Sequence, residues 1–256
     1  MRSLLAIDVG NTLTTLGLFE GERLAHRWRM TTRVARTSDE IWVFLRQFMQ
    51  TSSVTLERGC GVSISSVVPE RTDAFARMAV EKLQMEPLVI GADKVHSLKI
   101  EYDPPSSVGA DRLCGAVAAF KRFGGPVVIV DLGTATVFDV VSREGVYLGG
   151  VIAPGLASGV ESLHRSAALL PQAEVQFPPD VIGATTEAAI QSGVLYGTVE
   201  MIDGLVDRIR GRVPGDLTVL ATGGFAELIH SRSRTIGHVL PDLVLEGIRL
   251  ITDEQP

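Results

Sequence analysis

Apolar and polar residues follow one another in patterns that predict strands and helices in turn. Short apolar runs, each about the length of a buried strand, lie at 4–7, 61–68, 87–91, 127–130 and 219–221. Longer segments with helical signals lie between and after them, at 37–48, 69–85, 111–123, 156–170, 186–210 and 242–251. Residues 37–40 read Thr-Ser-Asp-Glu, which is a capping box. Because strands and helices interleave, the pattern predicts an α/β protein.

One part of this pattern occurs twice. The apolar run at 4–7 leads into Asp-Val-Gly-Asn-Thr at 8–12, and the run at 127–130 leads into Asp-Leu-Gly-Thr-Ala-Thr at 131–136. Each continues into two more apolar stretches, separated by a charged turn that contains a glycine. The spacing between the copies is the size of a domain, which indicates a duplicated domain and not a solenoid. We expect domains at 1–108 and 109–256.

Composition narrows the class of protein. The 256 residues are 45% hydrophobic and 21% charged, which excludes a disordered chain and suits one large domain or two modest ones. The net charge of −6, without a basic stripe, disfavours nucleic-acid binding. Two cysteines give neither a disulfide framework nor a paired-cysteine metal site. No apolar run approaches the roughly 20 residues that span a bilayer, and Asp8 follows the start too soon for a signal peptide. We expect a cytoplasmic protein with no membrane partner.

The two Asp-x-Gly turns have the chemistry of phosphate-binding loops. Gly10 lets a backbone approach an anion, and the backbone N–H groups with Asn11 and Thr12 can donate to phosphate oxygens. Asp8 can hold a hydrated Mg²⁺ against those phosphates. A single such motif is also typical of an Asx turn that closes a hairpin. The second copy at Asp131 favours the functional interpretation. Thr-Gly-Gly at 222–224 suits a flat ligand lying on bare backbone, although alone it is a common strand-to-helix turn.

The chain resembles a known family in several blocks. The Asp-x-Gly turns together with Thr-Gly-Gly resemble the actin, hexokinase and Hsp70-like ATPase superfamily, a duplicated ribonuclease-H-like fold of mixed sheets and flanking helices. Gly-Ala-Asp-Arg at 109–112, in order with 8–12, 131–136, 149–155 and 221–224, resembles type III pantothenate kinase. The final segment at 241–247 is also similar to that family's last helix. The resemblance covers almost the whole chain.

The resemblance implies a reaction, cofactors and partners. The reaction is ATP-dependent phosphorylation of pantothenate, the first step toward coenzyme A, with Mg²⁺ and a monovalent cation, K⁺ or NH₄⁺. It implies a homodimer with the cation and pantothenate sites near its interface. Asp111 is the implied catalytic base, and Asp131 is the implied cation ligand. The implied pantothenate site is Tyr102, Gly109, Ala110, Asp111, Arg112 and Thr186. The implied ATP site is Asp8, Val9, Gly10, Asn11, Thr12, Leu13, Thr14, Thr15 and Thr134, with Gly223 and Gly224 at the adenosine.

The residues themselves agree with this chemistry. Phosphoryl transfer to an alcohol needs positioning, charge neutralisation and a proton acceptor. Asp111 begins a predicted helix, where the helix dipole favours the carboxylate, and Arg112 offers a planar cation suited to the pantothenate carboxylate. The alternative is that Asp111 only caps the helix and Arg112 only faces solvent. Gly-Ala-Asp-Lys at 91–94 looks like the same motif, but no clear apolar helix follows it, so we expect a turn.

Three positions depart from the family pattern, and two other functions stay open. Leu13 and Val137 replace polar residues that are usual near the phosphates, and Gly115 replaces an asparagine. One alternative function is a kinase of the same superfamily that acts on another small alcohol. The other is a regulatory relative without catalysis. An ATPase assay with and without pantothenate distinguishes these three functions.

Overall fold

The chain forms two compact units. The computed structural model describes residues 3–56, 59–166, 170, 171 and 173–255. The first unit is Met1–Ala118 with Leu243–Pro256, and the second is Ala119–Asp242. The boundary that we expected between 108 and 109 therefore differs from the division in the structure. The helix α3 (Ala110–Phe123) begins in the first unit, and α7 (Leu243–Asp253) returns to that unit and packs on its sheet.

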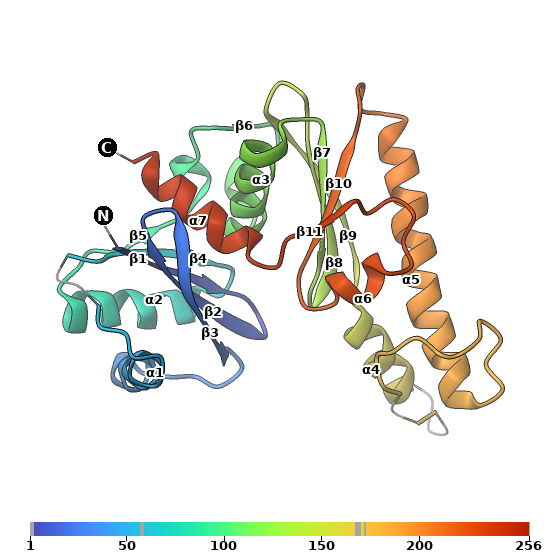
Figure 1. Ribbon diagram of the computed structural model, residues 1–256, viewed down its shortest axis with the longest axis horizontal. Coiled ribbons are helices and arrows are strands. Elements are labelled where there is room, and N and C mark those ends of the chain that lie inside the picture. Colours follow the sequence, from blue (N-terminus) through green and yellow to red (C-terminus); the bar gives the residue numbers. More distant parts are fainter. Residues whose placement is uncertain (1–2, 57–58, 167–169, 172, 256) are drawn as a thin grey trace. The chain divides into compact units, whose positions relative to one another are not determined.

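The first unit contains one sheet with helices on both faces (Figure 1). Its strands are β1 (Ser3–Val9), β2 (Leu13–Glu20), β3 (Arg23–Thr31), β4 (Gly61–Ser66) and β5 (Leu88–Val89), in the order β3-β2-β1-β4-β5. Leu5, Ile7 and Val9 alternate along β1 toward a core formed with α1 (Ser38–Thr51) and α2 (Pro69–Met78). The expected capping box at Thr37 and Glu40 is confirmed at the start of α1. On the other face, α7 contacts β1, β2 and β4.

The second unit repeats this sheet. Its strands are β7 (Val127–Leu132), β8 (Ala135–Val141), β9 (Val146–Pro154), β10 (Thr218–Thr222) and β11 (His238–Val239). They lie in the order β9-β8-β7-β10-β11, which matches β3-β2-β1-β4-β5 strand for strand. In both units the first three strands are antiparallel and the next two are parallel. The α/β class and the internal duplication are therefore confirmed.

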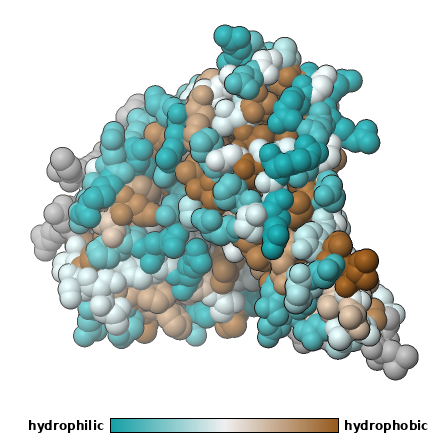
Figure 2. Space-filling model, turned by 45° about the vertical axis from the view of Figure 1, so that its right-hand side comes forward, coloured by the Kyte–Doolittle hydropathy of each residue, from teal (hydrophilic) through white to brown (hydrophobic). Residues whose placement is uncertain are grey.

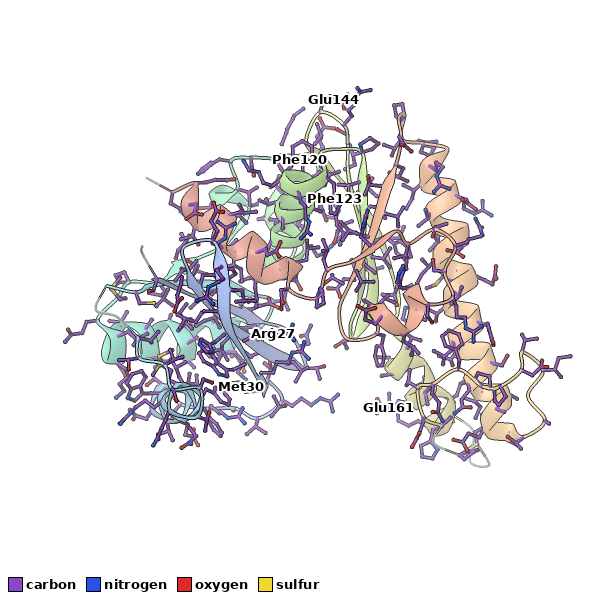
Figure 3. The ribbon with its side chains drawn as sticks, in the orientation of Figure 1. Arg27, Met30, Phe120, Phe123, Glu144 and Glu161 are labelled. Carbon is purple, nitrogen blue, oxygen red and sulfur yellow. The ribbon has the colours of Figure 1, made fainter. Side chains whose placement is uncertain are left out.

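Helices of the second unit cover its sheet and close its turns. The helix α5 (Thr186–Arg210) buries Leu195, Val199 and Ile202 against the sheet. The other helices of this unit are α4 (Leu156–Ser166) and α6 (Ala226–His230). The turn between β8 and β9 lies over Phe120, because a Cβ on Gly145, where φ is +77°, would lie 2.9 Å from its Cζ. Figure 3 shows Phe120 and Glu144 at this end of the unit.

Several predicted elements differ from the structure in their ends. The segment expected to be one helix at 69–85 is α-helical to Met78 and continues as a π-helical turn, η1 (Ala79–Leu83). The helix expected at 156–170 is described from Leu156 to Ser166, residues 167–169 lie outside the described residues, and residue 170 is not helical. The lookalike motif at 91–94 is a turn as expected, with a 3-10 segment η2 (Ala92–Lys94). The remaining short elements are β6 (Lys99–Ile100) and η3 (Pro105–Ser107).

Among the residues that the structure describes, no helix has both the length and the apolar character needed to cross a bilayer.

Candidate active site

The first Asp-x-Gly motif is a tight turn between β1 and β2. The Gly10 N–H donates to the Leu13 carbonyl oxygen at 3.1 Å, which closes the turn. The side chains of Val9 and Thr14 are buried, so these two residues offer a ligand only their backbone groups. The Thr14 hydroxyl lies 2.8 Å from that of Thr32, which ties β2 to the end of β3.

The other residues of this turn reach the surface. Asn11 and Leu13 are exposed, and Thr12 and Thr15 are partly exposed. The exposed Leu13 side chain explains why an apolar residue is tolerated here, since the fold does not need a polar group at that position. Asn11, Thr12, Thr15 and the backbone N–H groups are therefore the donors that the turn and the start of β2 present.

Asp8 lies on the β1 face opposite the helical core of α1 and α2. It is directly opposite Ser65 in the parallel pairing of β1 with β4. The Ser65 hydroxyl donates to Asp8 Oδ1 at 3.1 Å. Ser65 itself is fully buried, whereas Asp8 is partly exposed. Asp8 thus accepts a hydrogen bond from the buried Ser65 and is also accessible to solvent.

The Gly-Ala-Asp-Arg block forms the first turn of α3. Asp111 Oδ1 accepts a hydrogen bond from the Arg112 backbone N–H at 2.8 Å. A Cβ on Gly109 would lie 2.5 Å from that same oxygen and 3.2 Å from Val67 Cγ1, so any larger residue here would displace the carboxylate from its present position. Burial raises the pKa of Asp111 above its ordinary value, and the Arg112 N–H acts in the opposite direction. The Arg112 guanidinium carbon lies 5.9 Å from the centre of the Tyr102 ring.

A buried thiol shows that the two acidic motifs of the first unit lie together. Cys114, one turn after Asp111 in α3, has no exposed surface. Burial raises the pKa of its thiol well above the ordinary value, the charges of Asp8 and Asp111 raise it further, and a hydrogen bond with Ser65 opposes them. The structure therefore brings Asp8, from the first strand, into one neighbourhood with Asp111, about a hundred residues later.

In the second unit, three sequence blocks meet around the turn that follows Asp131. This residue lies near the end of β7, opposite Thr222 of β10. A Cβ on Gly223, where φ is +91°, would lie 2.5 Å from Asp131 Oδ1. A Cβ on Gly155 would lie 2.4 Å from the Thr134 carbonyl oxygen, to which the Ser158 hydroxyl donates at 3.0 Å. The glycines permit close backbone packing around this second turn.

The remaining predicted residues of the second unit lie on its surface. Thr134 and Gly224 are exposed, and a Cβ on Gly224 would meet nothing within 4 Å, so the backbone is bare there. Val137 pairs with Asp131 across β7 and β8, which places this departure from the family pattern beside the acid. Thr186 is exposed in the first turn of α5, directly after the cap residue Thr185.

The donors fit a hydrated magnesium ion held mostly by nucleotide phosphates. The described residues contain no group of three or more His, Cys, Asp or Glu side chains that could hold a metal. Mg²⁺ commonly keeps several waters and takes one or two carboxylates together with substrate phosphates. Asp8 beside a turn of exposed donors meets that requirement.

Two of these residues were not predicted from the sequence. Ser65 was read only as part of a strand, and Cys114 only as part of a helix. The available signal was the alternation of serine with apolar residues in this strand, at 63 and 65, followed by a further serine at 66. Only the β1–β4 pairing shows which of the two serines faces Asp8.

Sequence comparisons with a family model and with individual proteins point to the same family. The family described as type III pantothenate kinase matches residues 4–208. A protein of that name from Syntrophotalea carbinolica is 43% identical over 248 residues, covering 97% of each chain. Another from Anaeromyxobacter dehalogenans is 44% identical over 248 residues, covering 97% of this chain and 98% of its own.

Solved structures with much lower identity share the fold. A Campylobacter jejuni protein assigned to the Baf family of transcriptional activators has a TM-score of 0.63 at 18% identity, covering 98% of both chains. A ROK family glucokinase from Streptomyces griseus, solved with glucose and AMPPNP, has a TM-score of 0.54 at 11% identity, covering 96% of this chain and 97% of its own. At such identities the likeness concerns the fold alone.

Proposed function

The chain belongs to the type III pantothenate kinase family, and from this premise we propose how its own residues carry out the reaction. The protein is a kinase that uses ATP with a divalent metal to phosphorylate pantothenate, in the biosynthesis of coenzyme A. The observation that supports our assignment of roles most directly is that Asp8 and Asp111 lie around the same buried thiol.

Asp111 is the proton acceptor. The pantothenate hydroxyl oxygen attacks the γ-phosphorus, the bond to the bridging oxygen breaks, ADP leaves, and the hydroxyl proton passes to the Asp111 carboxylate. Burial raises the pKa of this carboxyl group, which makes it a stronger base than an exposed aspartate. The Arg112 N–H fixes one oxygen at 2.8 Å, so the carboxylate has a defined direction.

Arg112 and its neighbours bind the rest of pantothenate. The guanidinium is a planar donor that matches a carboxylate, and the Tyr102 ring at 5.9 Å restricts its position. Gly109 and Ala110 supply backbone beside Asp111. Thr186, exposed at the start of α5, supplies a hydroxyl donor.

The Asp-x-Gly turns bind the nucleotide. Mg²⁺, when bound, neutralises phosphate charge as it develops in the transfer. Asp8 would hold that ion, and Asn11, Thr12, Thr15 and the turn's backbone N–H groups would donate to phosphate oxygens. In the second unit, Thr134 donates to phosphate, and the bare backbone at 223–224 accepts the flat adenosine.

Asp131 is the ligand of a monovalent cation, K⁺ or NH₄⁺. Its carboxylate faces backbone that Gly223 allows to come close, since a Cβ there would lie 2.5 Å from Asp131 Oδ1. A carboxylate oxygen can coordinate K⁺ or accept a hydrogen bond from NH₄⁺. The family resemblance supports this role, and the cation dependence of the rate tests it.

We also propose a homodimer in the cytoplasm, where ATP is available. Large apolar side chains are exposed around α4 and before α5, where Leu163 is 40%, Val181 57% and Ile182 82% exposed. Figure 2 shows apolar surface at the end of the second unit that carries α4. A second copy would cover such surface, and Thr186 lies close to it in the sequence. Sedimentation should give about twice the 27.4 kDa chain mass.

The decisive experiment follows the labelled γ-phosphate of ATP. Incubation with pantothenate, Mg²⁺ and K⁺ should yield labelled phosphopantothenate, and ATP consumption should rise when pantothenate is added. A different acceptor alcohol that is phosphorylated faster would favour another small-molecule kinase. No ATP turnover under any of these conditions would favour a regulatory protein.

A further inference from the structure

We propose that Ser65 and Cys114 are positioning residues that orient the Asp8 carboxylate for binding Mg–ATP. This inference rests on the proposed role of Asp8. Neither side chain would touch the substrates. Both would act through a chain of hydrogen bonds, from the Cys114 S–H to the Ser65 oxygen and from the Ser65 O–H to Asp8 Oδ1.

The direction of each hydrogen bond follows from the number of available protons. Ser65 has one hydroxyl proton, and its oxygen lies 3.1 Å from Asp8 Oδ1, which can only accept while it is ionised. That proton is therefore committed to Asp8. Cys114 is buried beside Ser65 and carries the other available proton, so its S–H is left as the donor toward the Ser65 oxygen.

The surroundings fix both groups in place. Ser65 and Cys114 have no exposed surface, so water does not reach either side chain. A hydrogen bond that is removed here is therefore not replaced by one to water, and its partner is left unsatisfied. Ser65 is held by the β1–β4 pairing, in which it lies opposite Asp8. Cys114 is held by α7, because a Cβ on Gly247 would lie 1.9 Å from the Cys114 carbonyl oxygen. A rigid donor aimed at one carboxylate oxygen selects one orientation of Asp8.

The duplicated unit has a hydroxyl residue at the matching position. Thr222 lies opposite Asp131 in the β10–β7 pairing, just as Ser65 lies opposite Asp8 in the β4–β1 pairing. Thr222 is also buried, at 4% exposure. The same pairing of an aspartate with a buried hydroxyl residue in both units is expected if the hydroxyl orients the carboxylate opposite it.

The test compares Ser65→Ala with Ser63→Ala. Ser63 lies on the same strand face, is equally buried, and bonds Thr252 of α7 at 2.8 Å instead of Asp8. Binding of a non-hydrolysable ATP analogue is measured by calorimetry, once with excess Mg²⁺ and once with a chelator. We expect Ser65→Ala to weaken binding about tenfold with Mg²⁺, because a hydrogen bond to a charged group is lost, and to have little effect with the chelator. Ser63→Ala should lower the melting temperature without this Mg²⁺-dependent loss.

Cysteine variants test the second bond. Cys114→Ser keeps a donor and should bind Mg²⁺-nucleotide normally, whereas Cys114→Ala should bind about threefold more weakly. Cys60→Ala, which removes the other buried cysteine, is the control. The proposal is overturned if Ser65→Ala binds like the native protein, or if Ser63→Ala shows the same Mg²⁺-dependent loss. If Asp8→Ala itself binds Mg²⁺-nucleotide normally, it is the proposed role of Asp8 that fails.

Discussion

At Asp111, stability and catalysis place opposite demands on one carboxyl group. Burial raises its pKa in the folded protein, so the folded state favours the neutral form, while proton acceptance needs the carboxylate. The stability that the neutral group provides is present below the pKa of the unfolded chain and is lost as the pH rises through the folded pKa. Over that same pH range, the rate of phosphoryl transfer should rise.

Asp111→Asn separates these two effects. The amide keeps the shape and can still accept from the Arg112 N–H, but it cannot take a proton. We expect kcat to fall about 100-fold, the low end for a general base in a loose phosphoryl transfer. At pH 7 the melting temperature should equal or exceed that of the native protein, and nucleotide binding should be unchanged. A variant that keeps more than about a tenth of its turnover, or that melts lower, would indicate that Asp111 is a helix cap.

Asp131 should govern the response to monovalent cations. Initial rates in Na⁺ buffer should be low and should increase when K⁺ or NH₄⁺ is added. Asp131→Ala should abolish that increase because the cation loses its carboxylate ligand. Asp216→Ala removes an exposed carboxylate of the same unit and should keep the response. Equal rates of the native protein in Na⁺ and K⁺ would contradict the assignment.

In the packed pair of helices α3 and α7, the same substitution should have opposite effects at two glycines. A Cβ on Gly115 would meet only Leu243 Cδ2, at an ordinary 3.7 Å. Gly115→Ala should therefore raise the free energy of unfolding by up to about 1 kcal/mol through helix propensity.

The second glycine has no such space. Gly247→Ala forces a methyl group onto the Cys114 backbone and should lower the free energy of unfolding by about 1–3 kcal/mol. Chemical denaturation of both variants measures the two effects. If the two substitutions change the free energy of unfolding in the same direction, close packing at Gly247 does not determine its tolerance of a side chain.

For the whole molecule, the C-terminal helix α7 should contribute much of the stability of the first unit, to which it belongs. The helix α7 buries Leu243, Leu245, Ile248 and Ile251, each at 2% exposure or less. Burial of one such side chain contributes about 1.5–3 kcal/mol, so four approach the 5–15 kcal/mol that is typical of total stability. Deletion of 243–256 should therefore unfold the first unit, which is measured by circular dichroism and by loss of activity.

A shorter deletion is the matched control. Removal of the last three residues, 254–256, leaves all four buried side chains of α7 and should preserve most of the activity. A protein without 243–256 that melts like the native one would show that α7 is dispensable.

The local pattern of apolar and polar residues was sufficient to predict most helices and strands and the duplication of the domain. Apolar runs of strand length, the capping box at Thr37 and the limits of α5 are confirmed because each depends on neighbours a few residues away. The repeated Asp-x-Gly turn predicted two equivalent sheets, and the strand orders match. The family was also evident from short motifs. The roles of the individual site residues remain predictions.

Only the tertiary structure decided which distant residues meet. The helix α7 packs on the first sheet because this buries its apolar face, and the chain therefore divides at 118 and 243. The position of α7 at the end of the sequence does not indicate which of the two sheets it covers. Ser65 faces Asp8 because of one particular register between β1 and β4, and a shift by one residue would turn it to the opposite face. Register and helix docking are set by the summed packing of many residues far apart in sequence, which is why no short motif reveals them.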